Sequence, residues 1–257
     1  PFDCNAPVTE MTDLYASWTK TGGSGGGSHS SGSGSGTDTD IIENEDGSVT
    51  TIVTESDGMV TSTTEYTDGS VVRVTEKPDG TVLTTETTAD GIRSDTLKTP
   101  EGETETGINI PASVTEEFQS RDETLSLPMS PVSADGGNED SPVITVITNS
   151  SEPLRVEIPA EDPTPGTVAV LIREDGTEEI VRMCVASQTG IILTVENGAM
   201  IRITDNSRDF EDVSSGSWYY DAVGFVSSRE LFNGISDSEF GPGFAVSRAM
   251  IVTALWR

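Results

Sequence analysis

An eleven-residue spacing of Asp-Gly and Glu-Gly dipeptides is the feature that most limits how this chain can fold. The glycines of these dipeptides are Gly47, Gly58, Gly69, Gly80, Gly91 and Gly102. The segments between them are rich in threonine and valine, which favour β-strands. Asp-Gly favours the two-residue type I′ hairpin, because glycine tolerates a positive φ. The spacing therefore predicts an up-and-down meander of about six strands over residues 38–106.

The predicted meander has a weak apolar stripe that fades along the chain. Val49, Val60, Val71 and Val82 share one position of the repeat, whereas Arg93 and Thr104 occupy it in the last two units. Threonine and glutamate dominate both faces, so burial is poor and the strand register is loosely specified. We interpret the meander as a stalk or spacer. A Thr-lined ice-binding face and an adhesive surface remain alternatives, whereas a Ca²⁺-binding β-roll would need a different motif and a nine-residue period.

Two further segments precede the meander. Residues 1–19 contain Phe-Asp-Cys-Asn-Ala-Pro-Val-Thr and then Leu-Tyr-Ala-Ser-Trp, and residues 12–19 alternate as a strand does. This order resembles the closing strands of an internalin-type β-repeat of bacterial surface proteins. Residues 20–37 are almost entirely Gly, Ser and Thr, which predicts a flexible linker.

Residues 107–207 predict a separate β-rich domain, a small sandwich or roll. A helix is expected over Ala112 to Arg121, and Leu125, Leu127 and Met129 alternate as in a strand. Turn dipeptides separate the remaining candidate strands. These are Val143–Thr148, Leu154–Ile158, Val168–Arg173, Glu179–Val185, Ile191–Glu196 and Ala199–Thr204. No convergent polar cluster stands out, and the adjacent Glu178 and Glu179 are expected to point to opposite faces as surface charges.

Composition excludes several classes of function. The formal net charge is −30, which disfavours binding to nucleic acid or to anionic lipid. No apolar run approaches the 18 or so residues of a membrane span, so no membrane insertion is expected. Cys4 and Cys184 make no metal motif, and the single histidine, His29, lies in the linker. We therefore expect neither a catalytic site nor a metal or cofactor within the chain.

Residues 208–257 predict a helix–loop–helix. Ser217 is a candidate N-cap for a first helix that ends near Arg229, with Trp218, Ala222 and Phe225 on one apolar stripe. Phe240 is expected to plug the loop. Ser247 is a candidate N-cap for a second helix, from Arg248 to Arg257. The expected buried side of that helix consists of Ala249, Val252, Leu255 and Trp256.

The order of motifs in this segment closely resembles one S-layer homology repeat, a wall-binding module of bacterial surface proteins. These motifs are Phe-Glu-Asp-Val, Ser-Trp-Tyr-Tyr-Asp-Ala-Val-Gly-Phe-Val, Leu-Phe-Asn-Gly-Ile-Ser-Asp, Phe-Gly-Pro and Ser-Arg-Ala-Met. The preceding β-rich region is also similar to segments that often lie before such repeats in large Gram-positive surface proteins. Such repeats commonly occur in threes, so the resemblance implies further repeats in the full-length protein.

The resemblance also implies a ligand, a secondary cell wall polysaccharide that is often pyruvylated. The family signature Thr-Arg-Ala-Glu reads Ser247-Arg248-Ala249-Met250 here, so the acid is replaced. Arg248 keeps a planar fork suited to a carboxylate, and Ser247 keeps the hydroxyl. Gly234 is expected where the backbone approaches the ligand closely. Asp212 and Trp218 are further candidates, with a turn carboxylate and a core residue as their structural alternatives.

The sequence thus predicts a mainly β multidomain protein, with a Thr-rich β-meander and a small β-sandwich or roll before an α-helical S-layer homology module at 208–257. The predicted function is non-catalytic anchoring of a larger secreted protein at the cell wall or cell surface. The alternatives are an adhesin that uses the β-rich region to bind a host, and an anchor for an upstream surface hydrolase.

Overall fold

The computed structural model describes residues 37–102, 104–134 and 141–256. The predicted β-repeat end at 1–19, and all but the last residue of the predicted linker, lie outside these ranges. Cys4 and His29 lie outside them too. The mainly β class is confirmed, with short helices added to two sheets.

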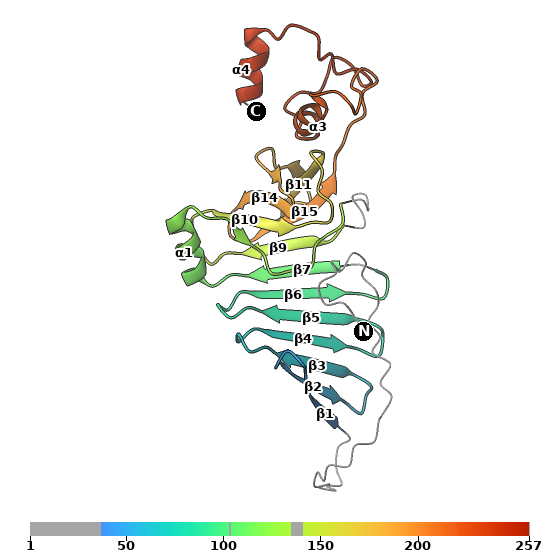
Figure 1. The fold of residues 1–257 in the computed structure, drawn as a ribbon, viewed down its shortest axis with the longest axis vertical. Coiled ribbons are helices and arrows are strands. Elements are labelled where there is room, and N and C mark those ends of the chain that lie inside the picture. Colours follow the sequence, from blue (N-terminus) through green and yellow to red (C-terminus); the bar gives the residue numbers. More distant parts are fainter. Residues whose placement is uncertain (1–36, 103, 135–140, 257) are drawn as a thin grey trace. The chain divides into compact units, whose positions relative to one another are not determined.

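The Asp-Gly repeat forms an antiparallel meander of seven six-residue strands, one more than the six expected (Figure 1). Its strands are β1 Asp38–Glu43, β2 Val49–Thr54, β3 Val60–Glu65, β4 Val71–Glu76, β5 Val82–Thr87, β6 Arg93–Lys98 and β7 Thr104–Asn109. Each strand pairs in full with the next, and the same register recurs at every step. The repeat therefore fixes the register that its side chains specify only weakly.

The predicted type I′ turn is wrong. In the first hairpin the Gly47 amide donates to the Asn44 carbonyl and the Asn44 amide donates to the Ser48 carbonyl, so three residues form the loop. A type I′ turn needs a positive φ at both central residues, yet within this loop only Gly47 has one, at 83°. This is the pattern of a type I turn closed by a glycine bulge. The preceding aspartate supplies the physical reason, because the Asp46 side chain accepts the Ser48 amide and thereby closes the loop.

The meander joins the following β-rich region in one sheet. β7 pairs in parallel with β9 Val143–Ile147, and the chain between them passes through α1 Ala112–Arg121 and β8 Leu125–Ser126. The sheet continues through β15 Ala199–Asp205 and β11 Thr167–Ile172 to β12 Glu178–Ile180, giving eleven strands. β7 crosses residue 106, where the division between meander and β-rich domain was expected, so the hydrogen-bonded ladder has no break there.

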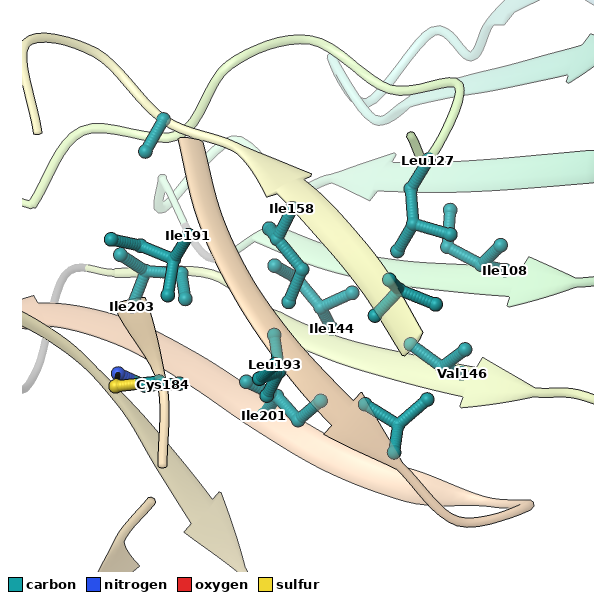
Figure 2. Close-up of a cluster of buried hydrophobic side chains, with 14 of the residues drawn as sticks. Ile108, Leu127, Ile144, Val146, Ile158, Cys184, Ile191, Leu193, Ile201 and Ile203 are labelled. Atoms are coloured by element: carbon teal, nitrogen blue, oxygen red, sulfur yellow. Dashed lines mark hydrogen bonds between the residues drawn. The ribbon is translucent and has the colours of Figure 1, made fainter. Parts of the chain in front are cut away.

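A second sheet of four strands packs on the far end of the first. Its order is β13 Val185–Ala186, β14 Gly190–Val195, β10 Leu154–Pro159 and β8. Buried side chains from both sheets form one cluster, which Figure 2 shows around Ile144 and Ile201 of the large sheet and Ile158 and Leu193 of the small one. The sandwich-like expectation for this region thus has a physical basis in two facing apolar surfaces.

Most of the local predictions in this region agree with the structure, with two corrections. The bounds of α1 are those expected, and Val114 is buried on its inner side. The expected strand Glu179–Val185 is instead two short strands, β12 and β13, which belong to different sheets. A turn at Val181 to Cys184, closed by the Cys184 amide and the Val181 carbonyl, redirects the chain between them. The second correction concerns β8, which has only two residues although Leu125 and Leu127 are both buried.

Candidate functional site

The C-terminal segment is the predicted helix–loop–helix. It contains α3 Tyr220–Ser228 and α4 Arg248–Trp256, joined by an irregular loop. Phe210 is buried ahead of α3, and its ring meets that of Phe240 edge-on, with 5.4 Å between centroids. Phe240 is half-buried and therefore plugs the loop, as expected.

Asp212 holds this loop in shape. Its two carboxylate oxygens accept the backbone amides of Phe240 at 2.8 Å and Gly241 at 2.7 Å. The Phe240 amide is the main reason that the pKa of Asp212 lies below its ordinary value, because a donated hydrogen bond favours the ionised form. The turn-carboxylate alternative accounts for this residue, and its contact with a glycan stays a prediction.

Gly234 is required by the packing of the chain itself. Its φ is 81°, and a Cβ placed there would lie 2.7 Å from the Glu239 carbonyl oxygen and 3.1 Å from the Phe210 ring. No side chain fits such a space without moving the backbone. The groups that lie close to Gly234 therefore belong to the protein itself. Close approach of a ligand to Gly234 stays a prediction.

Trp218 is not in the core. Its side chain is 93% exposed and touches Tyr219 edge-on, at 5.5 Å between ring centroids. The helix also begins later than expected, at Tyr220, and the Ser217 hydroxyl pairs with that of Ser214 rather than capping it. Because residues 217–219 form turns, Trp218 does not share a helical stripe with Phe225.

Ser247 and Arg248 lie together at the beginning of α4. The Ser247 hydroxyl accepts the Met250 amide at 3.2 Å, so the predicted N-cap is confirmed. Arg248 is the first residue of the helix and is exposed. Within the described ranges it makes no ion pair and no side-chain hydrogen bond. A cation at a helix N-terminus opposes the helix dipole, so its own helix gives Arg248 no stabilising role.

The expected buried side of α4 is exposed. Val252 is 65% exposed and Trp256 is 90% exposed, and Ala249 is exposed as well. Met250 and Ile251 are each 48% exposed. The loop before α4 and the helix itself line an apolar groove of about 420 Å³. This side of α4 is exposed because so small a module has too little apolar surface to cover the helix.

Arg229 is the residue of this segment that the sequence did not reveal. Its side chain is fully buried, although it forms no ion pair with a carboxylate of the described part of the chain. It donates to the carbonyls of Cys184 at 2.8 Å, Pro165 at 2.8 Å and Thr167 at 3.1 Å, and its guanidinium lies 4.0 Å from the Phe225 ring centroid. Desolvation lowers the pKa of Arg229 below its ordinary value. The guanidinium thereby attaches the end of α3 to β11 and to the turns around it, and no sequence pattern near Arg229 signals this.

The C-terminal segment matches one known protein family. Residues 209–249 match the family model of the S-layer homology domain. All five predicted site residues lie within this match, which we call the S-layer homology segment. They are Asp212, Trp218, Gly234, Ser247 and Arg248. S-layer homology domains are generally involved in cell-wall anchoring, and they bind cell-wall polymers. The segment therefore associates the protein with the cell surface. No match was found among curated proteins or among solved structures.

The described residues contain no group of three or more His, Cys, Asp or Glu side chains that could hold a metal ion. No described helix is both long and apolar enough to cross a bilayer. Glu178 and Glu179 each pair with a different arginine, Arg202 and Arg173 respectively, and so do not form a carboxylate pair. Cys184 is a buried free thiol.

Proposed function

We propose that this chain is a non-catalytic segment of a secreted surface protein, and that it anchors the protein by binding secondary cell wall polysaccharide. The observation that carries the proposal is Arg248, an exposed guanidinium inside the S-layer homology match that pairs with no other residue the structure describes. A guanidinium binds a carboxylate through two parallel hydrogen bonds, which suits the ketal carboxylate of a pyruvylated sugar.

The neighbours of Arg248 support the same role. Ser247 fixes the first turn of α4 and therefore the direction from which Arg248 leaves the helix. Trp218, at 93% exposed, offers a flat apolar ring of the kind that stacks on sugars. Asp212 and Gly234 act indirectly, because they shape the loop that leads towards α4.

The exposed apolar side of α4 indicates what completes the site. Met250, Ile251, Val252 and Trp256 are apolar side chains exposed to water, and their exposure is unfavourable. We propose that further S-layer homology repeats of the full-length protein cover this surface, and that the polysaccharide binds between repeats. Met250, which replaces the signature acid, then contributes packing rather than a hydrogen bond.

The test is the variant Arg248→Ala in the full-length protein, measured against purified wall sacculi. A hydrogen bond to a charged group contributes about 1.5–3 kcal/mol, so binding should weaken about tenfold or more. Arg155→Ala is the matched control, because Arg155 is exposed on β10 outside the S-layer homology segment. Equal binding by the two variants would reject Arg248 as the contact.

A chemical control separates carboxylate recognition from general charge. Sacculi from which the ketal pyruvate has been removed should bind wild type and Arg248→Ala equally. Arg248→Lys keeps the charge but loses the fork, so it should bind untreated sacculi with intermediate strength. Full recovery by lysine would show that charge alone is recognised.

One observation favours a second candidate function, adhesion through the meander. Both faces of β2, β3 and β5 carry half-exposed threonines, and hydroxyl pairs such as Thr50 and Thr64 at 2.9 Å link neighbouring strands. Removal of residues 38–59 deletes two complete repeats without shifting the register of the rest. Reduced binding to purified host glycoproteins after this deletion would favour adhesion, and unchanged binding would favour the spacer. An upstream hydrolase remains a compatible cargo for the anchor.

A further inference from the structure

The order of strands in the meander determines how it responds to tension. The chain enters at β1, at one edge of the sheet, and each following strand is the next neighbour in both sequence and space (Figure 1). A load applied through the N-terminal side therefore reaches β1 first. It cannot reach β2 until β1 has separated.

The register shows that each strand is loaded at its free end. Asp38, the first residue of β1, pairs with Thr54, and the hairpin turn lies at the opposite end of the strand beside the Glu43–Val49 pair. Tension at Asp38 thus opens the pairs one after another towards the turn. When β2 becomes the edge, Val49 pairs with Glu65 and the geometry repeats. Antiparallel hydrogen bonds lie perpendicular to the strands, so such a load breaks them singly rather than together in shear.

Little side-chain burial opposes this separation in the first five strands. No residue of β1 to β5 is buried, and Ser48, in the first turn, is the buried side chain of the connecting loops before Ile92. Burial begins abruptly around the sixth strand: Ile92, just before β6, is 3% exposed, Ser94 in β6 is 2% exposed, and Ile108 of β7 is fully buried. Peeling should therefore stop at β6.

The successive units share one length of eleven residues and one strand register. A Cβ at Gly58 would lie 3.5 Å from Pro78 and one at Gly80 3.5 Å from Pro100, so each of these two turns lies against the turn two hairpins further along. A Cβ at Gly91 would lie 3.6 Å from Pro111, which precedes α1, whereas one at Gly69 would meet nothing within 4 Å. In such one-dimensional arrays stability is approximately a sum of unit terms and nearest-neighbour terms, so an edge unit can open while the units beyond it stay folded.

We propose that the meander is a reversible extension device, which lengthens under tension by releasing one eleven-residue unit at a time from β1 to β5. Each release exchanges a strand spacing of about 4.8 Å for eleven extended residues, a gain of about 35 Å. The source of the load rests on the proposed anchoring, since the wall would hold the C-terminal side while drag acts on the other. Hairpins form in about 1–10 μs, so released units re-form when the load falls.

The experiment stretches the chain between tags at its two ends in optical tweezers, without any wall material. Five equal lengthening steps of about 35 Å are expected below the force that opens the β-rich region, and they should reverse on relaxation. A single concerted opening, or opening only together with the β-rich region, would overturn the proposal. Because no polysaccharide is present, either result leaves the anchoring proposal untouched.

Engineered disulfides give the decisive controls, because threonine pairs that already touch occur at three points. The Thr50 and Thr64 hydroxyls are 2.9 Å apart, those of Thr61 and Thr75 are 3.3 Å apart, and those of Thr96 and Thr106 are 3.2 Å apart. Tension passes through a disulfide, so only the residues inside the crosslinked loop stop contributing to the extension. Oxidised T50C/T64C and oxidised T61C/T75C should therefore each shorten the total extension by about 40 Å. Oxidised T96C/T106C, beyond the fifth unit, should leave all five steps and their extension unchanged.

Reduction should restore the full extension in every one of these variants. An unshortened extension from oxidised T61C/T75C would contradict release of β3 and β4. A shorter extension from oxidised T96C/T106C would also contradict the proposal, because that crosslink lies outside the strands that are released.

Discussion

The meander and the β-rich region use the same turn, yet they are stabilised differently. Asp68 accepts the amide and hydroxyl of Ser70, and in the β-rich region Asp175 accepts those of Thr177 in the same way. The glycine that follows has a positive φ in both cases. Only the β-rich region, however, covers its strands with a second sheet. Turn chemistry therefore suffices to form a hairpin, whereas burial decides how strongly and how cooperatively the hairpin is held.

The largest difference should appear on truncation of isoleucine. Ile144 on β9 is fully buried, and Ile144→Ala should lower the free energy of unfolding of the β-rich region by about 2–5 kcal/mol. Ile52 on β2 is half-exposed, so Ile52→Ala should cost about 1 kcal/mol or less, and only in the meander. Hydrogen exchange resolved by segment measures both. Equal losses would remove the proposed difference between the regions.

The next effect concerns the contact between the β-rich region and α3. Arg229→Met keeps much of the side-chain volume but leaves the carbonyls of Cys184 and Thr167 without their donor. Each unsatisfied buried group costs about 1–3 kcal/mol, so α3 should lose about 2–4 kcal/mol of protection from exchange. Arg208→Met is the control, because Arg208 is partly exposed and its ion pair with Glu230 is 3.7 Å long. Unchanged protection of α3 in Arg229→Met would show that the guanidinium does not hold it.

A glycine in each region tests whether the two turns are equivalent. Gly69 has φ 89° and Gly176 has φ 80°, and a Cβ at either would meet nothing within 4 Å. Gly69→Ala and Gly176→Ala should therefore carry the same backbone strain, about 1 kcal/mol. The loss of stability from Gly69→Ala should be confined to the two hairpins around it. The loss from Gly176→Ala should destabilise the whole β-rich region, because β12 pairs with the packed strand β11. Thermal unfolding would then shift for Gly176→Ala, and only local exchange would rise for Gly69→Ala.

The smallest expected effect is a pH dependence of opposite sign in the two kinds of carboxylate. Hydrogen bonds from Ser70 and Thr177 hold the pKa of Asp68 and Asp175 below 3.8, so the stability that they contribute is present above this value and is lost as pH falls through the lowered pKa. Half-burial raises the pKa of Glu86 above 4.5, so its contribution is fully present below 4.5 and is lost as pH rises through the raised pKa.

Carboxyl NMR titration and exchange between pH 6 and 3 measure both trends. Acidification should first tighten the meander near Glu86 and then loosen the turns of both regions. Glu86→Gln should abolish the first change and leave the second. Persistence of the first change in Glu86→Gln would assign it to the falling net charge instead.

Sequence reasoning succeeded where the cause was local. The hairpin positions follow from Asp-Gly spacing, α1 from an apolar pair four residues apart, and the cap of α4 from Ser247. The turn type was missed because Asp-Gly suits two geometries, and a side-chain hydrogen bond to the residue after glycine selects the three-residue loop. A hydroxyl-bearing residue at that position is the signal that could have indicated it.

Reasoning from sequence failed where burial depends on distant residues. Val252 was expected inside, and a core position was the alternative for Trp218, yet both are exposed because no described segment covers them. Arg229 was taken only as the end of a helix, yet it is buried because carbonyls some 45 to 64 positions away in the chain converge on it. Neither result is visible in the residues adjacent to these positions.

By itself, then, the sequence determined the period of the meander, the sites of its turns, and the kind of module at the C-terminal end. Each depends on backbone preferences and side-chain hydrogen bonds that span only a few residues. Tertiary structure alone decided that β7 joins β9 in parallel, that residues 179–185 divide between two sheets, and that a guanidinium attaches α3 to the β-rich region. These outcomes depend on which apolar and polar groups are removed from water together, and the groups concerned are far apart along the chain.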